Sequence, residues 1–488
     1  MERGYAGSSI FDWWHLPEQV DRRMVDYARA NASVGINGTV VNNVNASPLF
    51  LTERYLPKLA RLAEVLRPYR IRLYISARFS APRDVGGMET ADPLDPAVQA
   101  WWQAKVDEIY AAIPDFGGFL VKASSDGQPG PQDYGRTHAD GANMMTRAIG
   151  ERGVVIWRAF VHSETDQTDR AMQAHAEFVP LDGQFAENVI VQVKNGPIDF
   201  QPREPFHPLF GATPDTRLML EAQITKEYLG FASHLVFLAP MWEEVLQAKT
   251  GRAGTVVQTI MGGGMAGVAN TGSSRFSRAE PFLEAVVPMM MGSRQAAVNY
   301  MTPVGLTHQM ATDHHYGPAP WVCDLARPEW NPCYHAQADA EGIGFDRTAT
   351  GSGALGQYAP EIAAQWQDPA TIDEEYLLWF HHLPWDHTTQ SGRPLWSELV
   401  HRYDQRVTAA VQMAQNWAEL APHVDAQRHA EVAAHLAIQG REARWWRDAS
   451  IAYWRSRNGL AMPPGTTAPE HPIEHYRALD FPEAPGHP

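Results

Sequence analysis

Charged side chains stand where four short apolar runs of this sequence end. The runs are GGFLV at 117–121, GVVIW at 153–157, VIVQV at 189–193 and LMLEAQI at 218–224. Three cations and three carboxylates follow them, namely Lys122, Arg158, Lys194, Asp126, Asp199 and Glu227. Each charge alone fits a solvated loop, and Asp followed by Gly is a common turn pair. The repetition at the same end of successive runs indicates a site.

Two carboxylates on either side of a bond are what glycoside hydrolysis requires. One must be protonated to assist the leaving oxygen, and the other acts as a nucleophile or activates water. Cations in the same pocket suggest a substrate that is itself an anion. They also hold neighbouring carboxylates ionised by lowering their pKa. Hydrolysis of an acidic sugar would account for both features.

The first 270 residues alternate short β-rich runs with helical patterns. Seven runs are VGINGTVV at 34–41, IRLYISARF at 71–79, GGFLVKA at 117–123, GVVIWRAFV at 153–161, VIVQVKN at 189–195, LMLEAQI at 218–224 and MAGVAN at 265–270. They are apolar nearly throughout, as parallel strands covered on both faces are. We therefore expect an α/β fold, a (β/α)8-type TIM barrel over residues 1–275, with the site on the loops after the strands. An eighth strand would precede residue 1.

Long helical patterns dominate after residue 275. They include PLWSELVHRYDQRVTAAVQMAQNWAELAPHV and DAQRHAEVAAHLAIQGREARWWRDASIAYWRSRNGL. This change in pattern predicts an α-helical C-terminal domain over residues 276–488.

Composition and charge exclude several classes of partner. The formal net charge of −16 opposes binding to nucleic acid. No run of 18 apolar residues exists, so no membrane span is expected. The N-terminal stretch MERGYAGSSIFDWW lacks the apolar core of a signal peptide, so the chain as given is expected in the cytoplasm. Cys323 and Cys333, with His314, His315 and His335 nearby, match no zinc pattern, and neither a metal nor a cofactor is expected.

Several long stretches resemble the α-glucuronidases of glycoside hydrolase family 67. The matching stretches are ERGYAG, GINGTVVNNVNA, TADPLDPAVQAWW, IPDFGGFLVKA, GQPGPQDYGRTHADGANM, VIVQVKNGPIDFQPREPFHPLFGAT, EAQITKEYLG and MTPVGLTHQMATDHHYGPAPW. The resemblance covers most of the chain apart from its last tens of residues. It implies removal of glucuronic acid, or its 4-O-methyl form, linked α-1,2 to the terminal xylose of xylooligosaccharides. It also implies inversion at the anomeric carbon, without a metal.

The resemblance carries over to single residues. Asp126 takes the place of the general acid, while Asp199 and Glu227 match the two carboxylates that serve the water, with their order left open. Lys122, Arg158 and Lys194 match cations of the sugar pocket. The stretch HHYGPAPW matches the contribution of the C-terminal domain to the aglycone side, through His314, His315, Tyr316 and Trp321.

Three departures from the family pattern leave alternatives open. The family's N-terminal β-sandwich and first barrel strand lie before the first matched residue. Only SSRFSRAE joins Gly272 to Pro281, where the family carries several tens of residues, and Asp126 stands where the family has Glu. A shortened, impaired homologue that binds glucuronoxylan fragments is therefore the alternative function, and a hydrolase of another α-linked uronide is a third. An open barrel is expected to cover its edges in a homodimer or to unfold easily.

Overall fold

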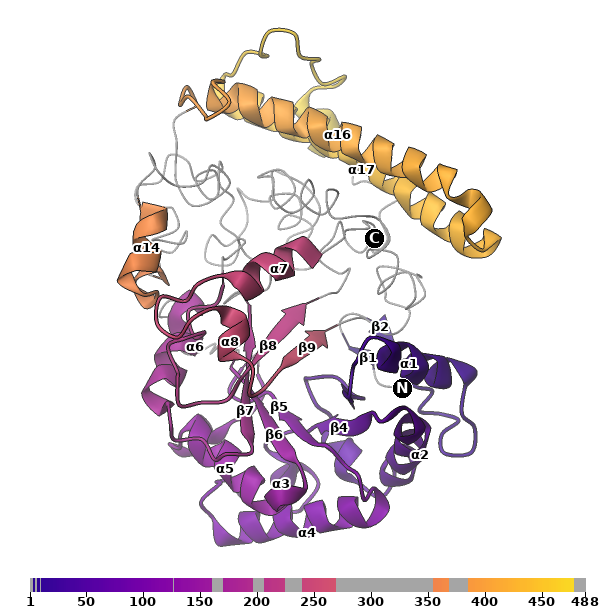
Figure 1. Ribbon diagram of the computed structural model, residues 1–488, viewed down its shortest axis with the longest axis vertical. Coiled ribbons are helices and arrows are strands. Elements are labelled where there is room, and N and C mark those ends of the chain that lie inside the picture. Colours follow the sequence, from indigo (N-terminus) through magenta and orange to yellow (C-terminus); the bar gives the residue numbers. More distant parts are fainter. Residues whose placement is uncertain are drawn as a thin grey trace. The chain divides into compact units, whose positions relative to one another are not determined.

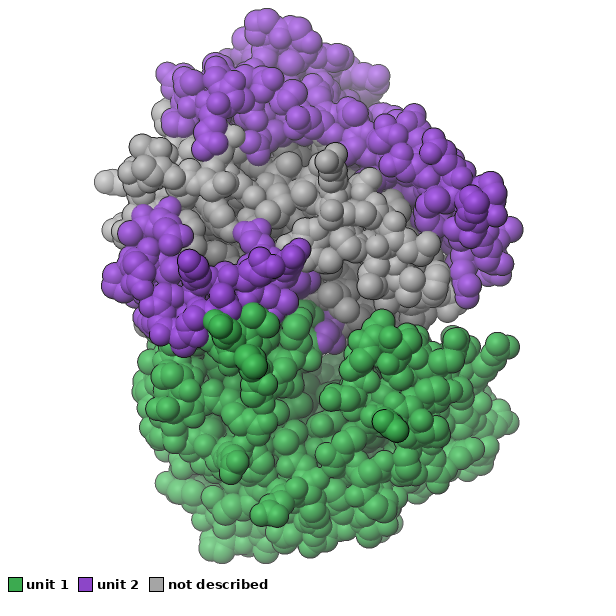
Figure 2. All heavy atoms as spheres, viewed as in Figure 1, with its two compact units in different colours: residues 1–197, 207–222, 257–266 green, residues 198–206, 223–256, 267–488 purple. Residues whose placement is uncertain are grey.

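The computed structural model describes residues 3–4, 7–8, 10–125, 127–159, 170–195, 206–223, 239–268, 354–367 and 385–477. The chain divides into two compact units, which are coloured separately in Figure 2. The first comprises residues 1–197, 207–222 and 257–266, and the second comprises residues 198–206, 223–256 and 267–488. The first unit holds nearly all of the sheet.

Seven strands form one sheet in the order of the chain. They are β3 (Gly38–Val40), β4 (Arg72–Ser76), β5 (Gly118–Val121), β6 (Val154–Arg158), β7 (Val189–Lys194), β8 (Leu218–Gln223) and β9 (Met265–Val268). The strands from β3 to β8 pair in parallel, each with the next one along the chain. Each of the seven apolar runs supplies one strand, as predicted. Because β3 and β9 are the two edges among the described strands, the sheet is a partial TIM barrel.

Helices occupy most of the described connections between the strands (Figure 1). They are α2 (Leu56–Leu66), α3 (Ala81–Asp84), α4 (Pro96–Ala112), α5 (His138–Ile149), α6 (Arg170–Phe178), α7 (Ala239–Gln247) and α8 (Val256–Thr259), while α1 (Arg22–Ser33) precedes β3. Local sequence sets their starts. The Asp95 side chain accepts from the backbone N–H of Ala97 to begin α4, and Thr137 and Asp140 form a capping box at α5.

The two faces of the sheet have different roles. Side chains on one face pack against helices, as Phe119 does against Trp102 of α4 and Trp157 against His138 of α5. The opposite face carries Leu120 and Ile156, which are paired in register between β5 and β6. Because side chains alternate along a strand, the next positions on this second face toward the strand ends are those of Lys122 and Arg158.

Two long helices, α16 (Leu395–Glu419) and α17 (Ala426–Asn458), lie side by side in the second unit (Figure 1). Their contact buries Met413, Trp417, Val432 and Leu436 among other apolar side chains. The shorter helices α14 (Pro360–Gln367) and α18 (Ile473–Arg477) belong to the same unit. The long helical patterns are confirmed, but a helical domain over residues 276–488 stays a prediction, as does the boundary at 275. Within the described chain, no helix is long and apolar enough to cross a membrane.

Candidate active site at the strand ends

The three predicted cations lie at the carboxyl ends of three adjacent strands. Lys122 follows β5, Arg158 ends β6 and Lys194 ends β7. Arg158 pairs in register with Gln192, and Lys194 pairs with Glu221 of β8. Since residues paired in register share a face of a sheet, these side chains point to the same side.

These side chains are all buried. The relative exposures of Lys122, Arg158 and Lys194 are 5%, 7% and 4%, and that of Glu221 is 1%. A buried charge is costly unless it is paired and hydrogen-bonded. The arrangement therefore needs partners, and the structure supplies them.

Arg158 and Glu221 form a buried bidentate ion pair. The Arg158 Nε donates to Glu221 Oε2 at 2.6 Å, and its Nη2 donates to Oε1 at 2.5 Å. Gln192 lies between them in the sheet, and its Nε2 donates to Glu221 Oε2 at 2.7 Å. Bidentate pairing of this kind fixes the plane of the guanidinium group as well as its position.

The surrounding cations keep Glu221 ionised. Burial on its own would raise the pKa of this carboxyl, but its attraction to Arg158, their hydrogen bonds, the charge of Lys194 and the Gln192 amide together lower the pKa to about 2. Glu221 is therefore negative at neutral pH and balances one of the three cations. Cations gathered in one place suit an anionic substrate.

Asparagines of the loop after β3 hold the opposite side of Lys122. The Lys122 Nζ donates to Asn45 Oδ1 at 2.9 Å. Asn42 fastens this loop to β4, because its amide donates to the Ser76 carbonyl at 2.8 Å and accepts from the Ser76 N–H at 2.7 Å. Sequence reasoning missed this role. Three asparagines in NNVNA, directly after a strand, were the available signal.

A buried histidine supports β6 from the helix side. Trp157 Nε1 donates to His138 Nδ1 at 3.1 Å, so the His138 proton lies on Nε2, which contacts Glu177 Oε2 at 2.9 Å. The His138 ring also stacks on Phe178, with 4.6 Å between the ring centroids. This network holds Trp157, the residue before Arg158. It was likewise missed, because a lone His in a helical pattern carries no signal of its own.

Several predicted site residues lie outside the described residues. They are Asp126, Asp199, Glu227, His314, His315, Tyr316 and Trp321. Their roles stay predictions, as do the substrate-binding roles of the three cations. In the part of the chain that the structure describes, no three His, Cys, Asp or Glu side chains gather in a way that could hold a metal ion.

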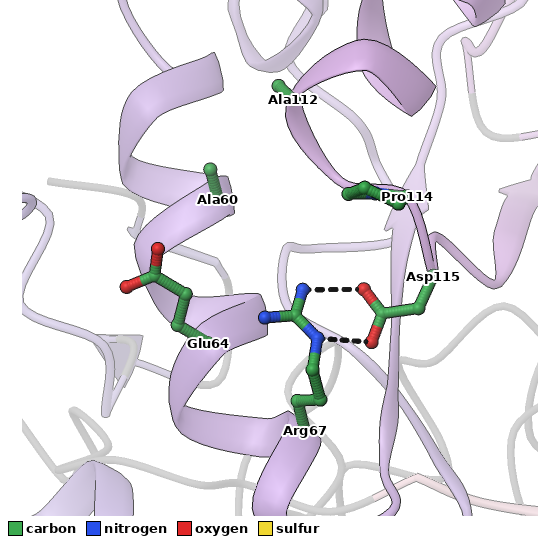
Figure 3. A pocket seen from close by; sticks show the side chains of 6 residues that line it. All are labelled: Ala60, Glu64, Arg67, Ala112, Pro114 and Asp115. Atoms are coloured by element: carbon green, nitrogen blue, oxygen red, sulfur yellow. Dashed lines mark hydrogen bonds and ion pairs between the residues drawn. The ribbon is translucent and has the colours of Figure 1, made fainter.

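A pocket of about 380 Å³ lies at the other end of the strands, beside the ends of α2 and α4 (Figure 3). Arg67 spans it with two bonds to Asp115, from Nε at 2.9 Å and from Nη2 at 2.7 Å. The Arg67 hydrogen bond lowers the pKa of Asp115. The N-terminal ends of the strands of a TIM barrel contribute to stability rather than to catalysis. The ion pair between Arg67 and Asp115 therefore has a structural role.

Two family models match this chain. The model of the glycosyl hydrolase family 67 middle domain matches residues 1–276, and the model of the family 67 C-terminus matches residues 271–467. The chain belongs to glycosyl hydrolase family 67. The resemblance expected from the sequence is thereby confirmed.

Curated relatives of this family 67 chain carry the name alpha-glucuronidase. Alpha-glucuronidase A of Emericella nidulans is 38% identical over 523 residues, covering 94% of this chain and 61% of the relative. Probable alpha-glucuronidase A of Aspergillus flavus is 37% identical over 520 residues, with the same coverage of each chain. This chain thus spans about three fifths of the length of the relatives that it matches.

Solved structures give a weaker likeness. A GH138 enzyme targeting pectin rhamnogalacturonan II aligns with a TM-score of 0.41 at 10% identity, covering 92% of this chain and 70% of that enzyme. A likeness at this level supports no inference about the family 67 chain.

Proposed function

We propose that this chain is an α-glucuronidase that hydrolyses the α-1,2 bond between (4-O-methyl)glucuronic acid and the terminal xylose of xylooligosaccharides. The observation that carries the proposal is the burial of Lys122, Arg158 and Lys194 together at the ends of three adjacent strands, with Glu221 bound to Arg158. The carboxylate of a uronate is the kind of group that such cations bind. The names of the family 67 relatives support the same activity.

In this proposal the cations bind the sugar carboxylate and its neighbouring hydroxyl groups. Glu221 holds the Arg158 guanidinium, and Asn45 holds the Lys122 ammonium, before substrate arrives. Preorganised charges of this kind lose little conformational freedom on binding. The oligosaccharide is the only partner that the proposal requires, and no cofactor takes part.

The chemical step is proposed as a single inverting displacement. Asp126 donates its proton to the glycosidic oxygen as the bond to the anomeric carbon breaks. A water attacks from the opposite face and gives a proton to Asp199 or Glu227. Acid and base should then stand about 6.5–9.5 Å apart, which leaves room for that water. His314, His315, Tyr316 and Trp321 would contact the xylose side of the bond.

Release of glucuronic acid from aldotetraouronic acid, followed by chromatography, tests the proposal. We expect release by the unmodified chain and a loss of several orders of magnitude in the Asp126→Asn variant. We expect a gain from Asp126→Glu, because the shorter Asp sets the carboxyl back by about 1 Å, a misplacement that costs on the order of a hundredfold. Binding of the oligosaccharide without any release would contradict the proposal and favour a binding protein.

A further inference from the structure

The loop after β5 is folded tightly against itself. Ser124 has a φ of +53°, which is uncommon for a residue other than glycine. Gly130 packs directly over it, so that a Cβ at position 130 would lie 1.8 Å from Ser124 Oγ. The Ser124 hydroxyl donates to Gln132 Oε1 farther along the same loop. The loop is therefore fixed at both ends.

Ser125 and Gln128 close a turn within this loop. The Gln128 N–H donates to the Ser125 carbonyl at 2.9 Å, and Gly127 has a φ of +70°. Glycine adopts such a positive φ without steric cost. Ser125 is 2% exposed, so one side of the turn is anchored in the protein.

Arg78, from the loop after β4, holds the other side of the turn. Its Nη1 donates to Gln128 Oε1 at 3.2 Å. Its Nε donates to Asp84 Oδ2 at 3.0 Å and to Ser80 Oγ at 3.1 Å. Ser80 also donates to Asp84 Oδ2, at 2.6 Å, so the guanidinium is braced from α3. One side chain thus joins the loops that follow two adjacent strands.

We propose that Arg78 is a positioning residue for the proton donor. Through Gln128 it holds the turn that Ser125 and Gln128 close, and Asp126 stands between these two residues in the sequence. The inference rests on the proposed function, in which Asp126 is the general acid. A displacement of about 1 Å at a reacting group can cost on the order of a hundredfold in rate. A single hydrogen bond to the turn can therefore matter for the chemical step.

The leaving group distinguishes this role from a purely structural one. A xylose hydroxyl is a poor leaving group and needs the proton, whereas 4-nitrophenolate leaves with little protonation. Loosening the turn should therefore slow the hydrolysis of aldotetraouronic acid far more than the hydrolysis of 4-nitrophenyl α-D-glucuronide. General damage to the fold would slow the hydrolysis of both substrates equally. Direct binding of the uronate by Arg78 would instead raise the KM of both.

The experiment compares kcat on these two substrates for Arg78→Ala, Gln128→Ala and Arg78→Lys. We expect the ratio of natural to aryl kcat to fall at least about tenfold in Arg78→Ala, less in Gln128→Ala and least in Arg78→Lys. Gln128→Ala leaves the pairing of Arg78 with Asp84 intact, so it serves if Arg78→Ala fails to fold. Arg61→Ala, which removes an exposed cation paired with Glu64 on α2, is the control and should not change the ratio.

An unchanged ratio in folded Arg78→Ala and Gln128→Ala would overturn this inference and leave the proposed function intact. Failure of the unmodified chain to release glucuronic acid from either substrate would overturn the proposed function, and the inference with it.

Discussion

Glu221 is the buried partner that orients Arg158. The pair joins β6 to β8 across Gln192 of β7, and the two residues are 63 positions apart in the sequence. The cations themselves could be predicted, because each follows an apolar run. The pairing could not, because Glu221 stands inside such a run and its partner depends on the register of three strands.

Mutation of this pair should show strong coupling. Arg158→Met or Glu221→Met alone should lower the free energy of unfolding by about 3–5 kcal/mol, because each leaves a buried charge without its main partner. The double Met variant should recover most of that loss while staying inactive on aldouronic acids. Urea unfolding of the three variants measures the coupling. Additive losses would show that the two side chains do not depend on each other.

Two buried groups make the fold sensitive to acid. Burial, followed by the repulsion of His175, lowers the pKa of His207 from 6.5 to about 3. Between pH 6.5 and 3 the unfolded chain therefore binds a proton that the folded chain does not bind. The free energy of unfolding falls as the pH drops from 6.5 toward 3. Glu221 has a pKa of about 2 in the folded chain, against an ordinary value of 4.5. Its contribution to the free energy of unfolding is therefore complete above pH 4.5 and is lost as the pH falls toward 2.

A pH series of thermal unfolding checks the histidine term. We expect the midpoint temperature to fall between pH 6.5 and 4, and the His207→Gln variant to show a shallower fall. A glutamine oxygen can replace the acceptor that His207 Nδ1 offers to the Leu209 N–H. An equal slope in both proteins would mean that His207 does not stay neutral in the folded chain.

At the scale of elements, the strand positions could be predicted and their limits could not. The run VGINGTVV spans residues 34–41, but β3 covers only Gly38–Val40. Val34 instead caps the end of α1, where its N–H donates to the Asn31 carbonyl, and its side chain is 64% exposed. Apolar character alone does not separate the end of a helix from the start of the next strand.

The start of β5 depends on a glycine. Gly118 has a φ of +134°, and a Cβ there would lie 1.9 Å from the Val154 carbonyl oxygen of β6. Gly118→Ala should therefore lower the free energy of unfolding by on the order of 3 kcal/mol, through strain and lost pairing with β6. Gly87→Ala is the matched control, because Gly87 also has a positive φ but no atom within 4 Å of the added Cβ. Equal losses in urea unfolding would show that strand contact is unimportant at Gly118.

At the scale of the molecule, the described sheet has two edges, β3 and β9. Met265 of β9 is 50% exposed, and Val257 and Met261, shortly before β9 in the chain, are 44% and 81% exposed. Open strand edges with apolar neighbours promote pairing with another chain. Whether a barrel closes is not encoded in any one apolar run, so sequence patterns could not decide it.

These edges predict self-association. We expect light scattering to show dimers or larger species, and the double variant Met261→Lys with Met265→Lys to shift them toward monomer, because like charges repel along the edge. Lys substitution at exposed positions of α1, such as Ala30→Lys, is the control. A monomer of high thermal stability in the unmodified chain would contradict this expectation.

Proton NMR of aldotetraouronic acid during the reaction tests the central claim most directly, because it follows bond cleavage and stereochemistry together. The proposed inverting hydrolysis of an α bond predicts that β-glucuronic acid forms first and that the α anomer grows in only by later mutarotation. Formation of the α anomer first, or no cleavage by the folded chain, would contradict the account.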